Sequence, residues 1–128
     1  MKFSICVVAH PLDSAHRTAI RFCNALIAKN HQIEQIFFYQ DAVILASNLL
    51  VPAQDEYPTQ QNWLDFSNQN QIELNVCVSA AIKRGVLNDA DCARYNKNQS
   101  NVHSCFNIVG LGEFLTSMDN ADKQVTFG

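Results

Sequence analysis

The sequence has 128 residues, of which 48% are hydrophobic and 16% are charged. This length has room for one hydrophobic core, and the composition is too apolar and too weakly charged for a disordered segment, so we expect a single folded domain over residues 1–128. The formal net charge of −3 excludes the broad positive surface of a nucleic-acid-binding protein, and direct contact with nucleic acid is not expected.

The first third of the chain has the pattern of a strand, a helix and a second strand. The apolar run Phe3–Ala9 predicts a strand that is covered on both faces. Ser14 is predicted to cap the following helix, whose apolar residues recur at helical spacing until Asn30 provides a left-handed stop. Residues 33–39 predict the second strand. A strand, helix and strand in this order predict a right-handed crossover and a parallel sheet.

The rest of the chain alternates short helices and strands. The sequence predicts an irregular, proline-flanked segment at 51–59, which is a candidate edge of a site or an interface. Gly85 is predicted to end a helix and Asn88 to cap the next one. The predicted helices cover 41–50, the region of Trp63 to Phe66, 79–84, 88–93 and 112–118, and the remaining strands cover 72–78, 106–109 and 123–127. The fold class is therefore α/β, a three-layer α/β/α domain with a mostly parallel sheet of four or five strands.

The cysteines and the N-terminal segment indicate where the protein resides. Five cysteines without a CxxC pair exclude a disulfide scaffold, and free thiols suit a reducing cytoplasm. The apolar run at the N-terminus is broken at His10 and Pro11 without a cleavage site, so it predicts a buried strand and not a signal peptide. No apolar stretch approaches the roughly 20 residues of a membrane span. We expect a cytoplasmic protein with no membrane contact.

Cys77 is the strongest candidate for chemistry because it lies at the carboxyl end of the predicted third strand, just before a helix. Ligands and reactive groups gather at this edge of parallel sheets. A helix N-terminus also favours a thiolate or a persulfide anion. The alternative is a small buried core residue, a common fate of a free cysteine. Lys83 and Arg84 lie about 9 Å further along the helix and are expected to line a surface rather than touch the sulfur.

The other four cysteines are weaker candidates. Cys6 falls inside a strand and Cys23 on the apolar face of a helix, where packing explains both. Cys92 and Cys105 lie in or beside the polar segment 96–104, so the roles of a resolving thiol and of an incidental surface thiol both stay open for them.

The histidines do not predict a metal site. His10, His16, His31 and His103 form no paired-ligand motif with the cysteines. His10 follows the first strand at the same edge as Cys77, so a Cys-His dyad stays open beside an ordinary loop role.

Two further motifs have ordinary explanations. Gly110-Leu111-Gly112 lacks the third glycine of a dinucleotide motif and indicates a tight turn. Asp55 and Glu56 are read as solvated charges in the proline-flanked segment.

Five segments spread along the chain carry a resemblance to a known family. They are Asn24–Ile27 with His31, Phe37–Tyr39, Pro52–Tyr57, Leu74–Val86 and Gly110–Glu113. Together they resemble the TusD-type subunits of the DsrE-like sulfurtransferases over essentially the whole length. The segment around Cys77 is the most specific of the five.

The resemblance implies a persulfide relay that ends in 2-thiolation of the wobble uridine of tRNA. The family's active cysteine falls on Cys77, which would accept sulfane sulfur from a TusA-like carrier and pass it to a TusE-like acceptor. The implied partners in a hetero-hexamer are TusB-like and TusC-like subunits. The implied chemistry is thiol exchange, which needs no cofactor and no metal.

Two alternatives stay open beside this relay. One is a DsrE-type sulfur-trafficking protein of dissimilatory sulfur oxidation, and the other is a non-catalytic assembly subunit. The chain also departs from the family pattern: residues 9–14 contain no glycine, and Ala42 stands where the family often has one. These changes affect the expected shape of the loops and leave Cys77 in place.

Overall fold

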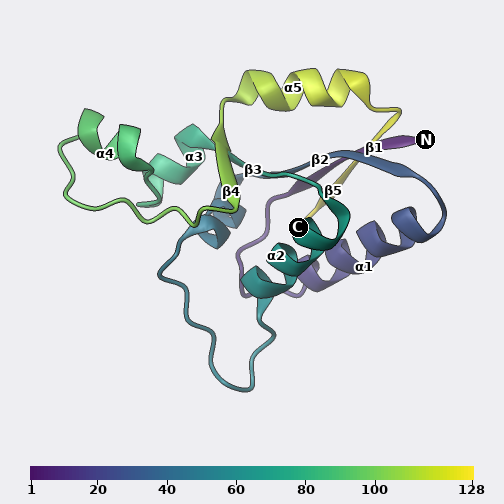
Figure 1. Ribbon diagram of the computed structural model, residues 1–128, viewed down its shortest axis with the longest axis horizontal. Coiled ribbons are helices and arrows are strands. Elements are labelled where there is room, and N and C mark those ends of the chain that lie inside the picture. Colours follow the sequence, from purple (N-terminus) through teal and green to yellow (C-terminus); the bar gives the residue numbers. More distant parts are fainter.

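Five parallel strands form one sheet in the computed structural model, which describes residues 1–128 (Figure 1). The strand order is β4-β3-β2-β1-β5, so the last strand of the chain pairs with the first. The strands are β1 (Lys2–Val7), β2 (Gln32–Phe38), β3 (Leu74–Cys77), β4 (Phe106–Val109) and β5 (Lys123–Phe127). The predicted parallel sheet is confirmed, and the third strand is shorter than predicted because Val78 already belongs to a helix.

Two neighbouring aromatic residues show that helices cover both faces of the sheet. Phe37 and Phe38 are consecutive in β2 and point to opposite faces. Phe37 stacks on Phe114 of α5 (Leu111–Asn120) with ring centroids 4.3 Å apart. Phe38 meets Trp63 of α2 (Thr59–Asn70) edge to face at 5.2 Å. α1 (Ala15–Ala28) lies beside α2, and α5 crosses the other face (Figure 1). The predicted three-layer α/β/α architecture is confirmed.

The helix ends lie where the sequence predicted them at Asn30, Gly85 and Asn88, and Ser14 has the predicted position without the predicted side-chain bond. Asn30 and Gly85 adopt the left-handed conformation, with φ of 65° and 75°. The Asn88 side chain accepts a hydrogen bond from the Asp91 N–H at 2.9 Å and caps α4 (Asp89–Arg94). Ser14 is the N-cap residue of α1, as predicted, but its side chain makes no capping hydrogen bond, and the Asp13 carboxylate accepts the Ala15 N–H at 2.8 Å instead.

The segment after β2 differs most from the sequence prediction. The helix expected at 41–50 is a 3-10 helix, η1 (Gln40–Ala46), and the chain from 47 to 58 is irregular apart from one bridge between Ser47 and Val102. η1 packs against α3 (Val78–Lys83), which begins at the end of β3. This packing brings the ends of β2 and β3 together. None of the helices has both the length and the apolar character that crossing a bilayer requires.

Candidate functional site

Cys77 is the last residue of β3 and the N-cap of α3, which confirms its predicted place between strand and helix. Its side chain is 1% exposed. Asn75 pairs with Phe37 in the neighbouring strand, and Phe37 packs against α5. Alternation along β3 puts Cys77 on the same face as Asn75. The thiol therefore belongs to the face of the sheet that α5 covers.

A hydroxyl group lies next to the thiol. The Cys77 Sγ and Ser79 Oγ atoms are 3.4 Å apart, within hydrogen-bond distance for sulfur. A thiolate or a persulfide anion has no proton to give, so with either anion Ser79 is the donor. Ser79 itself is exposed, whereas Cys77 is buried. The buried sulfur is thus in contact with a residue that reaches the surface.

Ser79 also lines a pocket of about 190 Å³ between η1 and α3. Its other lining residues are Tyr39, Gln40, Ala80, Lys83 and Arg84. Gln40 has a φ of 50°, a left-handed conformation that is uncommon for a residue other than glycine. The prediction that Lys83 and Arg84 line a surface is confirmed. They share the pocket with Ser79, which contacts the Cys77 thiol.

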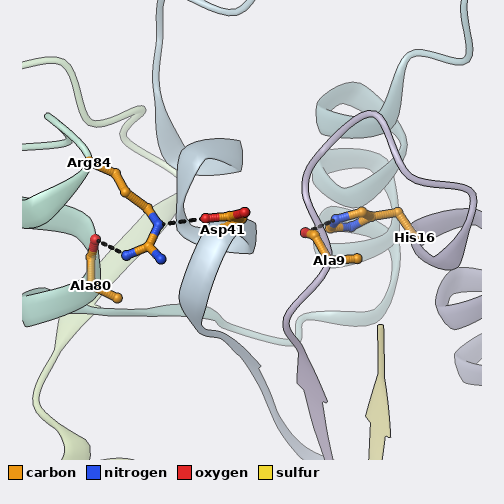
Figure 2. A network of polar contacts seen from close by, with 5 residues as sticks. All are labelled: Ala9, His16, Asp41, Ala80 and Arg84. Atoms are coloured by element: carbon orange, nitrogen blue, oxygen red, sulfur yellow. Dashed lines mark hydrogen bonds and ion pairs between the residues drawn. The ribbon is translucent and has the colours of Figure 1, made fainter.

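An ion pair joins the two walls of this pocket. The Arg84 Nε donates to the Asp41 carboxylate at 2.8 Å, and its Nη1 donates to the Ala80 carbonyl at 3.1 Å (Figure 2). Arg84 is thereby tied to both η1 and its own helix. Lys83 is exposed and forms no ion pair, so it carries the free positive charge of the pocket.

The other cysteines are separated by burial. Burial raises the pKa of the Cys6 thiol to about 11 and that of Cys23 to about 12, so both are uncharged at neutral pH and are poor nucleophiles. Cys92 is buried on α4, which leaves Cys105 as the only exposed cysteine.

The histidines behave differently from one another. The exposed His10 ring accepts a hydrogen bond from the Leu12 N–H at 3.2 Å. The strand that precedes it, β1, is separated from β3 by β2, which corresponds to about 10 Å between the two strands. The sequence did not identify His16 as a candidate functional residue. It belongs to α1 and is fully buried, with its ring against the chain that follows β1. It lies one helical turn before Ala19, on the apolar face of α1, and this spacing is the signal that could have found it.

His16 links three elements through its ring. Its Nε2 donates to the Ala9 carbonyl at 2.8 Å (Figure 2), and its Nδ1 accepts from the Trp63 indole N–H at 3.0 Å. This arrangement uses the neutral imidazole. It fixes the chain after β1 to α1 and α2.

The fold contains no cluster of side chains that could coordinate a metal ion. No three His, Cys, Asp or Glu side chains are grouped so that they could hold an ion. The polar groups near Cys77 are instead a hydroxyl, a lysine and an arginine that is already paired. They suit an anion better than a cation.

The fold and the site together define a parallel α/β domain that presents a thiol, next to a hydroxyl, at the carboxyl edge of its sheet. The chain belongs to the DsrE/DsrF-like family, whose family model matches residues 1–127. The family resemblance predicted from the sequence is therefore confirmed.

Several curated relatives carry the names of sulfurtransferases. A "Sulfurtransferase TusD homolog" of Pseudomonas aeruginosa is 38% identical over 128 residues, which cover all of this chain and 98% of that protein. A "Putative sulfurtransferase DsrE" of Allochromatium vinosum is 33% identical over 129 residues and is covered to 99%. A "Sulfurtransferase TusD" of Serratia proteamaculans is 36% identical over 110 residues, 86% of this chain and 85% of that protein. The predicted enzyme class, a sulfurtransferase, is confirmed by these relatives.

A solved structure supports the fold. The crystal structure of the ychN protein from E. coli has a TM-score of 0.76 and covers 99% of both chains. Its sequence identity is 21%, so this likeness concerns the fold alone.

Proposed function

We propose that residues 1–128 form one sulfurtransferase domain that carries sulfane sulfur as a persulfide on Cys77. The sulfur would come from a TusA-like carrier and pass to a TusE-like acceptor, for 2-thiolation of the wobble uridine of tRNA. The single observation that supports this most is Cys77 at the end of β3, in a chain that is 38% identical over its full length to a TusD homolog.

The proposed chemistry is two successive thiol exchanges. The Cys77 thiolate attacks the outer sulfur of the donor persulfide, the bond between the two donor sulfurs breaks, and the donor leaves as a thiolate. The acceptor thiolate then attacks the outer sulfur on Cys77 in the same way. One sulfane sulfur moves in each step without net oxidation, so the relay consumes no cofactor. Cys6 and Cys23 are poor alternatives to Cys77 as the carrier, because burial keeps their thiols uncharged.

The proposed partners are TusB-like and TusC-like subunits in a cytoplasmic hetero-hexamer. An exposed apolar groove of about 280 Å³ supports an interface of this kind. Leu12 and Val51 line it and are 78% and 88% exposed, and the neighbouring Leu49 is 73% exposed. Apolar side chains gathered at this exposure are typical of surfaces that bind another protein.

Persulfide loading tests the role of Cys77 directly. The purified protein is incubated with a persulfide-loaded donor, and its intact mass is measured before and after addition of a reductant. We expect wild type to gain one sulfur atom that the reductant removes, and Cys77→Ser to gain none. Cys105→Ser is the matched control, because it removes the exposed thiol. Equal loading of wild type and Cys77→Ser would disprove the assignment.

A second candidate function keeps the same thiol chemistry but uses it in dissimilatory sulfur oxidation. The DsrE relative of Allochromatium vinosum, which is 33% identical over the full chain, supports this candidate. Measurement of 2-thiouridine in tRNA after deletion of the gene separates the two. Loss of the thiolated nucleoside supports the tRNA relay, and its persistence supports sulfur trafficking.

A third candidate is a subunit that only assembles its partners, which the burial of Cys77 supports. Complementation of the deletion with Cys77→Ala decides this case. Full restoration of thiolated tRNA by that variant would favour an assembly role over a catalytic one.

A further inference from the structure

The burial of Cys77 raises the question of how a donor sulfur reaches it. The thiol is 1% exposed, yet exchange requires a sulfur–sulfur bond of about 2 Å to form at its Sγ atom. β2 and β4 flank β3 within the sheet, and helices cover both of the sheet's faces. The approach must therefore come from beyond the end of the strand, where α3 begins.

At this end of the strand the polar side chain in contact with the sulfur is Ser79. Its Oγ is 3.4 Å from the Cys77 Sγ, and no other side chain forms a polar contact with the thiol. Ser79 is exposed and lines the pocket between η1 and α3. Ser79 is therefore the residue that links the thiol with the pocket.

The charges of the pocket suit an anion. Ser79 and Lys83 lie four residues apart, on the same face of α3. Arg84 is neutralised by Asp41, which leaves the Lys83 ammonium as the unpaired charge. A persulfide is an anion near neutral pH, so a cation at the pocket mouth attracts the donor.

We propose that this pocket is the entrance for the donor persulfide and that the Ser79 hydroxyl donates a hydrogen bond to the sulfur anion on Cys77. The proposal rests on the proposed function of Cys77 as the sulfur carrier. In the loading step the bond from Cys77 Sγ to the outer donor sulfur forms while the donor sulfur–sulfur bond breaks, and its electron pair leaves on the donor thiolate. Ser79 stabilises the Cys77 thiolate before the attack and the persulfide after it, and gives up no proton in the net reaction.

The test of Ser79 is the pH dependence of loading by glutathione persulfide, followed by intact mass. We expect Ser79→Ala to load about tenfold more slowly at neutral pH and to reach half-maximal rate about one pH unit higher, the size of a lost hydrogen bond to an anion. Ser79→Thr keeps the hydroxyl and should retain the wild-type profile. Equal melting temperatures of the three proteins establish that folding is intact.

The outcomes distinguish this proposal from the proposed function. If Ser79→Ala loads at the wild-type rate with the same pH profile, the role of Ser79 is disproved while Cys77 remains the carrier. If Ser79→Ala and Ser79→Thr slow loading equally, the hydroxyl is not the cause and the proposal is also disproved. Loading of Cys77→Ser would disprove the proposed function itself.

The role of the pocket as the entrance has a separate test. We expect Lys83→Gln to slow loading by the anionic donor severalfold at low salt, with the difference shrinking as salt is added. Lys123→Gln is the matched control, because it removes the same charge from the exposed strand β5, which is separated from β3 by two strands. Equal rates for the two variants would disprove the entrance.

Discussion

His16 shows how a single buried side chain supports the edge of the sheet where the candidate site lies. Its ring donates to the Ala9 carbonyl and accepts from the Trp63 indole, and the acceptor role of Nδ1 requires the neutral form. Burial lowers the pKa of His16 below its ordinary value of 6.5, against a smaller raising effect of the Ala9 hydrogen bond. The loop after β1 is therefore held in place by a group that must stay uncharged.

This arrangement predicts that acid destabilises the fold. As the pH falls through about 6.5, the unfolded chain takes up a proton on His16 before the folded chain does, so the free energy of unfolding decreases below that pH. His16→Gln removes the titration and should cost about 1 to 3 kcal/mol at neutral pH, because glutamine replaces the two ring bonds only in part. Urea unfolding at about pH 7.5 and about pH 5.5 measures both effects.

His10→Gln is the control for that experiment, because His10 is exposed and its ring bonds only the neighbouring Leu12 N–H. It should leave the pH dependence of stability unchanged. A wild-type protein that is equally stable at both pH values would contradict the role assigned to His16.

Residue by residue, the sequence was informative where a position follows from an element boundary. Cys77 could be located because its strand ends where a helix begins, and the burial of Cys6 and Cys23 follows from their spacing. His16 and Ser79 could not be assigned, because their roles depend on contacts across the fold or on a short side-chain distance. A histidine on the apolar face of a helix can bond to many different groups, and the sequence does not say which residue of the opposing helix will face it.

At the scale of elements, the strands were easier to predict than the segments that join them. Continuous apolar runs predict buried strands, whereas the conformation of η1 depends on its packing against α3 and β3. The sequence of η1, with Ala42 and Leu45 facing inwards, fits an α-helix as well as a 3-10 helix. Its tertiary contacts, which a local pattern does not contain, select the tighter form.

α5 is the element on which the Cys77 face of the sheet depends most. It crosses that side of the sheet, and the stacked pair of Phe114 and Phe37 anchors it (Figure 1). The Gln35 side chain adds a hydrogen bond to the Phe114 carbonyl at 3.2 Å. Helix α5 also joins β4 at one edge of the sheet to β5 at the other, so its loss would release an edge strand.

We therefore predict that Phe114→Ala lowers the free energy of unfolding by about 3 kcal/mol, since it removes a buried ring and leaves a cavity against Phe37. Leu115→Ala, at a neighbouring position that is 51% exposed, should change it by less than about 0.5 kcal/mol. Chemical denaturation of the three proteins checks the comparison. Equal losses in both variants would mean that α5 is not anchored through Phe114.

At the scale of the whole molecule, the two sides of the sheet differ in what they leave exposed. The side of α1 and α2 carries the apolar groove around Leu12 and Val51, whereas the pocket beside Ser79 lies between η1 and α3. Separate surfaces suit a relay subunit, because permanent partners and a transient sulfur donor then do not compete for one face. The proline-flanked segment that the sequence marked as a candidate interface, residues 51–59, contributes to the groove.

This separation predicts that assembly and sulfur loading respond to different substitutions. Leu12→Lys combined with Val51→Lys should prevent co-elution with TusB-like and TusC-like subunits in size-exclusion chromatography, because two charges would have to be buried without partners. Both side chains are more than three-quarters exposed in the single chain, so its melting temperature and its loading by glutathione persulfide should stay as in wild type. Leu115→Lys, on α5, is the control and should still co-elute. Co-elution of the double variant would exclude the groove as the interface, and a loss of loading in it would show that the two surfaces are coupled.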